Sequence, residues 1–186
     1  MLDLGSAPGG WLQAACTLVG NWKDQPHARV VGVDQRSFPI PKAHVDKRVQ
    51  VLHMNAKQVD RAILQQAMHS WELKEDKGQA WIPMHVVLSD MAPPTTGMRD
   101  VDAQNAMELA HLAVSIAVGN LKDSHGLLGL GGNMVIKTFD GQDAEALRKE
   151  VKPHFQRALW VRPETIRPGS REKYLVALHR CIPHLC

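Results

Sequence analysis

The segment at residues 2–11, Leu-Asp-Leu-Gly-Ser-Ala-Pro-Gly-Gly-Trp, constrains the fold of this chain more than any other stretch. It reads as the end of a strand, a glycine turn and the start of a helix. Gly5 permits a tight turn after the strand, Pro8 suits a first helical turn, and the glycines at 9–10 let a ligand approach the backbone closely. The pattern predicts a helix over residues 11–19 and a nucleoside-binding turn before it.

The spacing of this turn indicates which nucleoside suits it. A dinucleotide fingerprint reads G-x-G-x-x-G, so that N–H groups at the helix start hold a pyrophosphate, but here Ala7 stands at the second glycine position and Pro8 lacks an N–H. S-adenosylmethionine, which carries adenosine and no phosphate, fits better, and Asp3 could face its cationic methionine end. An ordinary turn without a ligand is at least as common for a lone glycine cluster, so the rest of the chain has to decide.

Length and composition favour one domain over residues 1–186, because no Pro-rich or Ser/Gly-rich linker divides the chain. No apolar run is long enough to span a bilayer and no signal-peptide pattern precedes the glycine turn, so we expect a soluble protein. Cys16, Cys181 and Cys186 form no C-x-x-C pair, and no two histidines lie three or four residues apart. The sequence therefore supports neither a disulfide framework nor a zinc site, and we expect no metal.

The net charge of +3 is too small to indicate nucleic-acid binding by itself, but its distribution is informative. Arg162, Arg167, Arg171 and Lys173 cluster around one predicted turn, where they could meet phosphates. A solvated surface loop explains the same charges equally well.

Short apolar runs alternate with helical patterns along the rest of the chain. Strands are expected at residues 29–34, 49–54, 84–90, 133–139, 158–162 and 172–179, and helices at 59–71, 102–121 and 142–154. A charged loop is expected at 74–79, and Asp102 is expected to cap the second of these helices. The nearly continuous apolar run at 84–90 indicates a strand buried on both faces. The alternation predicts a doubly wound α/β sheet, with ligands at the carboxyl ends of the strands.

Polar side chains follow two of the predicted strands. Asp34 ends the second strand at a spacing from the glycine turn that suits a ribose-binding carboxylate. Asn55 follows the third strand, where its amide could read an adenine edge by donating and accepting hydrogen bonds. A turn-forming asparagine is the commoner role for such a residue.

The connection before the seventh strand is too short for a helical crossover, because only nine residues separate Arg162 from Glu172. The seventh strand should therefore run antiparallel to the sixth, which brings Glu172 to the same rim as Asp90 and Lys137. Burying Lys137 among apolar neighbours is costly unless it is paired or functional. Asp90 beside Lys137, with Glu172 orienting the pair, suits removal of a proton from a poor nucleophile such as a sugar hydroxyl during methyl transfer.

These motifs together resemble the FtsJ-type ribosomal RNA 2′-O-methyltransferase family. The matching stretches are residues 2–11, Val33-Asp34, Leu88-Ser89-Asp90-Met91-Ala92-Pro93, Val135-Ile136-Lys137-Thr138-Phe139 and Ser170-Arg171-Glu172-Lys173-Tyr174. The resemblance implies a Rossmann-like methyltransferase fold of seven mostly parallel strands, with an antiparallel last strand and helices on both faces. It also implies S-adenosylmethionine as cofactor, held by Asp3, Gly5, Ala7, Pro8, Gly9, Gly10, Trp11, Asp34, Asn55 and Asp90.

The family's catalytic tetrad is Lys-Asp-Lys-Glu, and Asp90, Lys137 and Glu172 match its last three members. Its first lysine precedes the glycine turn in the family and has no counterpart here, so we expect that this chain lacks an N-terminal segment that carries it. Asn55 departs from the family's usual acid at the adenine site. The resemblance further implies ribosomal RNA and the large ribosomal subunit or its assembly intermediate as partners, with a uridine ribose as the methylated group, and no membrane partner. Residues 96–102 look closer to the mitochondrial branch of the family than to the bacterial one, which predicts a mitochondrial location, with a cytoplasmic location as the alternative.

Three other functions agree with parts of the sequence. A catalytically inactive ribosome-assembly factor with this fold would explain the missing lysine and Asn55. A base N-methyltransferase would more typically carry Asp/Asn-Pro-Pro-aromatic after the fourth strand, where this chain has Asp90-Met91-Ala92-Pro93-Pro94. A nicotinamide oxidoreductase is disfavoured by the altered phosphate turn.

Overall fold

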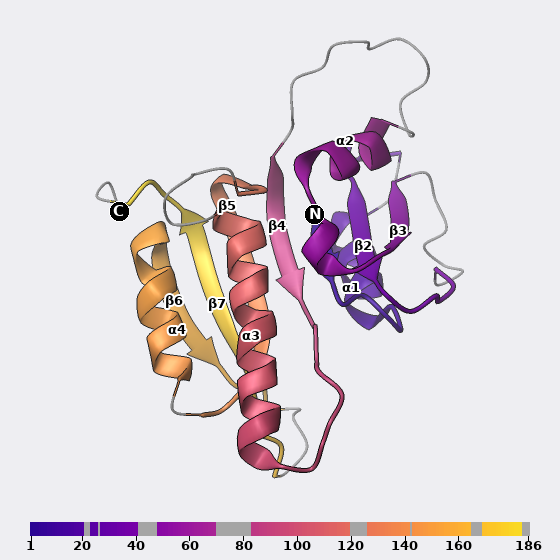
Figure 1. Ribbon diagram of the computed structural model, residues 1–186. Coiled ribbons are helices and arrows are strands. Elements are labelled where there is room, and N and C mark those ends of the chain that lie inside the picture. The colour runs from indigo at the N-terminus through magenta and orange to yellow at the C-terminus, as the bar shows by residue number, and fades with distance from the viewer. Residues whose placement is uncertain are drawn as a thin grey trace.

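The computed structural model describes residues 1–20, 23–25, 27–40, 48–69, 83–119, 126–141, 143–164 and 169–183 (Figure 1). Within these ranges seven strands form one sheet, in the order β3-β2-β1-β4-β5-β7-β6. The strands are β1 (Leu2–Leu4), β2 (Val30–Asp34), β3 (Val49–His53), β4 (Met84–Ser89), β5 (Leu128–Phe139), β6 (Phe155–Val161) and β7 (Glu172–Arg180). The predicted α/β sheet is thereby confirmed.

Strand β7 alone among these runs against its neighbours. It pairs antiparallel with β5 on one side and with β6 on the other, whereas the β1, β2, β3, β4 and β5 pairings are parallel. In the register, Lys137 lies opposite Tyr174 and Phe139 opposite Glu172. The antiparallel last strand inferred from the short connection is correct.

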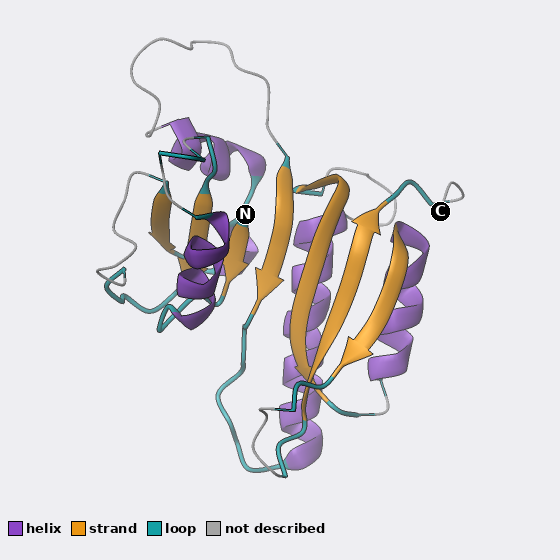
Figure 2. Ribbon diagram, turned by 180° about the vertical axis from the view of Figure 1, so that it is seen from behind, coloured by secondary structure: helices purple, strands orange, loops and turns teal. Residues whose placement is uncertain are grey.

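Helices cover both faces of the sheet (Figures 1 and 2). Helices α3 (Arg99–Val118) and α4 (Ala144–Val151) lie over one face of the β4, β5, β7 and β6 half, and α1 (Gly10–Val19) lies on the opposite face beside β2. Helix α2 (Arg61–His69) and the 3₁₀ turns η2 (Ala56–Gln58) and η3 (Lys152–His154) complete the described elements. Trp71, the predicted loop at 74–79 and Leu121 lie outside the described residues.

The main core lies between the sheet and α3. Small side chains on one side of α3 allow its backbone to approach the strands closely, and the large apolar side chains come from the sheet. The fully buried members include Leu2, Leu4, Val87, Met134, Ile136 and Leu175 on the strands and Ala113 and Ala117 on the helix. This packing fixes the strand ends that carry the candidate site.

Several sequence-based expectations about individual elements are wrong. Helix α1 begins at Gly10 after a left-handed Gly9, so Pro8 precedes the helix instead of opening it. Helix α3 begins at Arg99 with Met98 at its N-cap, and Asp102 lies in the first turn. Asp102 accepts hydrogen bonds from Thr96 and Gly97, so its side chain fastens the preceding loop to the helix.

Strand β4 is not buried on both faces as expected. His85 is exposed and Val86 and Leu88 are half-buried, because a hollow of about 540 Å³ separates this side of β4 from α1. Trp11 and Leu18 on α1 line the same hollow. The apolar run predicts the buried face of β4 correctly, but it carries no information on how far α1 extends over the other face.

Strand β5 starts at Leu128, five residues earlier than expected, because its first part contains three glycines that weaken a strand pattern. Gly132 is required there, since a side-chain Cβ would lie 2.9 Å from the Gly129 carbonyl oxygen and 3.0 Å from that of His85. After β7, Cys181 is disulfide-bonded, which cysteine spacing along the sequence did not indicate. Among the described residues, no helix has both the length and the apolar character to cross a membrane.

Candidate active site

A cavity of about 580 Å³ lies at the carboxyl ends of β1, β2 and β4, within the range of small-molecule sites. Three of the predicted cofactor residues line it, namely Gly5, Asp34 and Asp90. The remaining described lining residues are Val33, Gln35, Arg36, Met54, Ala56, Met91, Ala92, Pro93, Pro94, Thr95 and Leu109. The structure therefore brings together strand ends that are distant in the sequence around one hollow.

The glycine turn forms one wall of this cavity. Gly5 has φ of +75°, and a Cβ there would lie 2.7 Å from the Met91 backbone nitrogen. The N–H groups of Gly5 and Ser6 both donate to the Val33 carbonyl, which fixes the turn against β2. Glycine is thus needed at position 5 both for its backbone conformation and for the close approach of the loop after β4.

Asp34 is held by three backbone and side-chain donors at the end of β2. Its Oδ2 accepts from the Ala7 N–H at 2.9 Å, and its Oδ1 accepts from the Arg36 N–H at 2.8 Å and from the Arg36 Nε at 3.4 Å. Burial alone would raise the pKa of Asp34, but these donors and the Arg36 charge lower it below its ordinary value. Asp34 is therefore an ionised acceptor at the cavity wall.

Asp3 lies in the middle of β1 and is fully buried. No described residue donates a hydrogen bond to either carboxylate oxygen. Burial, followed by the charges of Asp90 and Asp34, raises the pKa of Asp3 from 3.8 to about 7. Asp3 is not among the described residues that line the cavity, but its charge can act on a cation bound there, and its direct contact with a cofactor remains a prediction.

The three predicted catalytic residues meet at the rim. Lys137 Nζ forms an ion pair with Asp90 Oδ1 and lies 3.8 Å from Glu172 Oε1. The Lys137 side chain is only 13% exposed, whereas those of Asp90 and Glu172 are 27% and 36% exposed. The arrangement places one amine between two carboxylates, at the edge of the cavity that Asp90 lines.

Two residues were missed as site residues, Tyr174 beside this group and Arg36 beside Asp34. Tyr174 stands opposite Lys137 in the β5/β7 register, and its ring stacks on Trp11 with centroids 5.8 Å apart. Burial and the charges of Glu172 and Asp90 raise the pKa of Tyr174. The signal was the two-residue period of a strand, because Tyr174 follows Glu172 by two positions and shares its face. Arg36 was missed as well, although it follows Asp34 by two residues.

The other predicted cofactor residues do not line this cavity. Asn55 caps η2, where its Oδ1 accepts from the Lys57 N–H, so the turn-forming role is the one observed. The ring of Trp11 faces Tyr174 and the hollow beside β4. Pro8 and Gly10 are exposed at the turn, and Ala7 contributes backbone hydrogen bonds to Asp34 and Arg36. Contact of Asn55, Ala7, Pro8, Gly9, Gly10 and Trp11 with a cofactor remains a prediction.

Cations gather around Asp140, which follows β5 at the same rim. Lys173 Nζ lies 2.6 Å from Asp140 Oδ1 and 4.3 Å from the centre of the Trp160 ring. Arg171 donates to the Asp140 carbonyl and Arg162 to the Ser170 carbonyl, and both arginines lower the pKa of Asp140 after Lys173. We call Arg162, Arg171 and Lys173 the rim cations; Arg167 lies outside the described residues.

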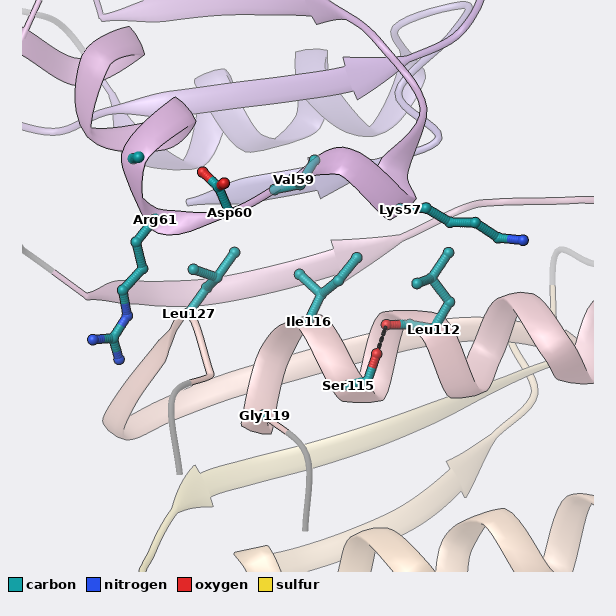
Figure 3. A pocket seen from close by; sticks show the side chains of 10 residues that line it. Lys57, Val59, Asp60, Arg61, Leu112, Ser115, Ile116, Gly119 and Leu127 are labelled. Carbon is teal, nitrogen blue, oxygen red and sulfur yellow. Dashed lines mark hydrogen bonds between the residues drawn. The ribbon is translucent and has the colours of Figure 1, made fainter. Parts of the chain in front are cut away.

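A second hollow, of about 710 Å³, lies away from this rim (Figure 3). It is bordered by Lys57, Asp60 and Arg61 on one side and by Leu112 and Ile116 of α3 on the other. Ser115, also in its lining, donates its hydroxyl to the Leu112 carbonyl at 2.8 Å. None of the predicted site residues is among its described lining residues. Within the part of the chain that the structure describes, no three His, Cys, Asp or Glu side chains gather closely enough to hold a metal ion.

The sheet order, the glycine turn and the acid-lined cavity define a Rossmann-like fold of the kind that methyltransferases have. Solved structures show the same fold: a ribosomal RNA methyltransferase from Plasmodium falciparum has a TM-score of 0.63 at 21% identity, over 96% of this chain and 85% of that one. Human methyltransferase-like protein 13, solved in complex with SAH, has a TM-score of 0.52 at 14% identity, over 96% of this chain and 71% of that one.

The chain belongs to the FtsJ-like methyltransferase family, whose model matches residues 1–180. A curated relative from Haloquadratum walsbyi, "Ribosomal RNA large subunit methyltransferase E", is 33% identical over 180 residues, which is 97% of this chain. The chain spans 60% of the length of that relative. The family resemblance inferred from the motifs is confirmed.

Proposed function

We propose that this chain is the catalytic domain of an S-adenosylmethionine-dependent 2′-O-ribose methyltransferase that acts on ribosomal RNA. The observation that carries the proposal is the placement of Lys137 between Asp90 and Glu172, beside a cavity with the acidic groups that a cationic nucleoside requires. Membership in the FtsJ-like methyltransferase family supports the same activity.

The cavity residues fit S-adenosylmethionine. Asp34 offers an ionised carboxylate for ribose hydroxyls, and Gly5 leaves the backbone wall without a side chain. Asp3 is a buried carboxyl group without a hydrogen-bond partner among the described residues, so a nearby positive charge would stabilise its ionised form. The bound cofactor would supply a methyl group on a cationic sulfur, and the human neighbour in complex with SAH supports this cofactor class.

The protein's own contribution to the reaction lies in positioning and proton removal. A ribose hydroxyl is a poor nucleophile, and the Lys137 amine, once it has given up its own proton, can accept the hydroxyl proton as the oxygen attacks. Asp90 and Glu172 then lie beside the resulting ammonium. The cavity and the rim together hold acceptor and donor in line, which lowers the entropic cost of the displacement.

The acceptor atom gives the direct test of this function. Methyl transfer to ribosomal RNA should vanish when the target nucleotide carries a 2′-deoxyribose, because the attacking oxygen is then absent. The measurement is incorporation of labelled methyl groups into two RNAs that differ only at that sugar. Persistent transfer to the deoxy substrate would indicate a base as the acceptor, and absence of transfer to both RNAs would favour the inactive assembly factor.

Ribosomal RNA as partner is supported by the rim cations. Arg162 and Arg171 are exposed next to the Asp90, Lys137 and Glu172 group, and only Asp140 opposes the cluster directly among the interactions described. Positive charges beside the acceptor site suit RNA phosphates. The large-subunit uridine and the assembly intermediate are proposed on the family resemblance and on the relative's name.

Removing the two arginines should weaken RNA binding in a salt-dependent way. For Arg162→Ala with Arg171→Ala, we expect the slope of log affinity against log salt to fall by about 1 to 2, because each phosphate contact releases roughly one counterion. Fluorescence titration at several salt concentrations measures the slope. The matched control is Lys149→Ala with Lys152→Ala, which removes two exposed cations from α4 and η3. An equal change in the control would assign the effect to net charge alone.

We also propose a mitochondrial location. The proposal rests on residues 96–102, which resemble the mitochondrial branch of the family. Fractionation of cells that express the full-length protein tests the location.

A further inference from the structure

The guanidinium of Arg36 joins Ala7 and Asp34, which are 27 residues apart in the sequence. Its Nη2 donates to the Ala7 carbonyl at 3.0 Å, and its Nε donates to Asp34 Oδ1 at 3.4 Å. The Arg36 side chain is 72% exposed, yet the residue lines the cavity at the carboxyl ends of the strands. Arg36 therefore links the glycine turn to the end of β2 at the wall of the proposed cofactor site.

Ala7 completes a closed ring of hydrogen bonds. Its N–H donates to Asp34 Oδ2 at 2.9 Å while its carbonyl accepts from Arg36. The N–H of Ala7 therefore holds the Asp34 carboxylate, and its carbonyl holds the Arg36 guanidinium. Neither the carboxylate nor the turn can rotate without breaking a contact with Arg36 or Ala7.

The ring also determines which oxygen of Asp34 is available to a ligand. A carboxylate oxygen has two lone pairs. Oδ1 already accepts two hydrogen bonds, both from Arg36, whereas Oδ2 accepts one, from Ala7. The open acceptor position is therefore on Oδ2, whose direction is fixed by the two contacts on Oδ1.

We propose that Arg36 is a positioning residue of the cofactor site, which orients Asp34 Oδ2 and the glycine turn toward the ribose of the cofactor. This inference rests on the proposed function, because it assumes a ribose in the cavity. Arg36 acts through Asp34 and Ala7 and takes no part in methyl transfer. An exposed ion pair without this role would contribute little and would leave ligand affinity unchanged.

Calorimetric titration with S-adenosylhomocysteine tests the proposal. We expect Arg36→Met to weaken affinity roughly tenfold, because the oriented acceptor is lost. Arg36→Lys should recover only part of the affinity, since a lysine is a point charge and cannot bridge Asp34 and Ala7 as a fork. The control Arg157→Met removes an exposed arginine from β6, at the other edge of the sheet, and should bind as the wild type does.

A double-mutant cycle with Asp34→Ala separates positioning from direct contact. If Arg36 acts mainly through Asp34, Arg36→Met should weaken binding much less in the Asp34→Ala background than in the wild type, because only its contact with Ala7 remains to be lost. Equal, additive losses would overturn the proposal and indicate an independent contact of Arg36 with the ligand. Full recovery by Arg36→Lys would overturn the role of the bridging geometry.

The pH dependence of binding gives a readout that a merely structural residue would not change. Arg36 and Ala7 hold the pKa of Asp34 below its ordinary value. In the wild type, the contribution of Asp34 to ligand affinity should therefore persist to acid pH. In Arg36→Met, the loss of affinity on acidification should begin at higher pH. Asp3, with its pKa near 7, and Asp90 also face this region and should contribute equally in both proteins.

The outcomes distinguish this inference from the proposed function. Wild-type protein that does not bind S-adenosylhomocysteine would overturn the proposed cofactor and the role of Arg36 together. Wild-type protein that binds, with Arg36→Met equal to it in affinity and in pH profile, would overturn only the role of Arg36. Thermal melting of each variant verifies that the compared proteins are folded.

Discussion

Lys137→Met should lower the rate of methyl transfer by about 10²- to 10⁴-fold, the usual contribution of a positioned general base. Methionine keeps most of the side-chain volume, so the 13% exposed position stays packed, but no amine remains between Asp90 and Glu172. Because Lys137 does not line the described cavity, cofactor affinity should change little.

Single-turnover transfer to ribosomal RNA and a cofactor titration on the same preparation separate the two quantities. Lys152→Met, in the exposed η3 turn, is the control for removal of a lysine. A variant at Lys137 that turns over at nearly the wild-type rate would show that Lys137 is not the base. Equal losses of affinity and rate would instead place Lys137 in cofactor binding.

Asp3→Asn should make the ligand-free protein more stable at pH 8 and weaken cofactor binding there. The folded-state pKa of Asp3 is raised, so its contribution to stability is fully present below the ordinary value of 3.8 and is lost as pH rises to about 7. The difference between these values corresponds to roughly 4 kcal/mol at alkaline pH. Asparagine has nearly the same shape and removes that cost.

Urea unfolding at pH 4, 6 and 8 measures this effect directly. The free energy of unfolding of the variant should exceed that of the wild type by an amount that grows with pH and is small at pH 4. Asp24→Asn changes an exposed carboxylate between α1 and β2 and should show no such trend. A difference for Asp3→Asn that does not depend on pH would contradict a raised pKa. Unchanged cofactor affinity at pH 8 would remove Asp3 from the site.

The sequence was sufficient for the features that depend on local pattern and chain length. The length of the connection between Arg162 and Glu172 predicted the antiparallel β7, and from it the meeting of Glu172 with Asp90 and Lys137. The glycine turn at residues 2–11 predicted α1 to within one residue. These predictions are correct because the geometry of strands and short connections leaves few alternatives.

The features that were missed depend on distances between separate segments. The spacing of Arg36 from Asp34 allows a contact between them, but the bridging role of Arg36 depends on an Ala7 carbonyl that only folding brings near. The exposure of His85 reflects how far α1 extends over β4, which β4's own residues do not encode. The sequence allows two roles for Asn55, and the structure shows its capping contacts with Lys57 and Gln58, whereas its contact with an adenine remains a prediction.

The position of β7 in the sheet has a consequence for the protein during its synthesis. Strand β7 is the last described strand in the chain, but in the sheet it lies between β5 and β6. Strands β5 and β6 therefore cannot be joined in the sheet before β7 has been synthesised. A chain still emerging from the ribosome can therefore form the glycine turn and the Asp90 and Lys137 pair, yet has no Glu172 beside them and leaves two strand edges unpaired. Catalytic competence should consequently appear late in translation, when β7 has entered the sheet.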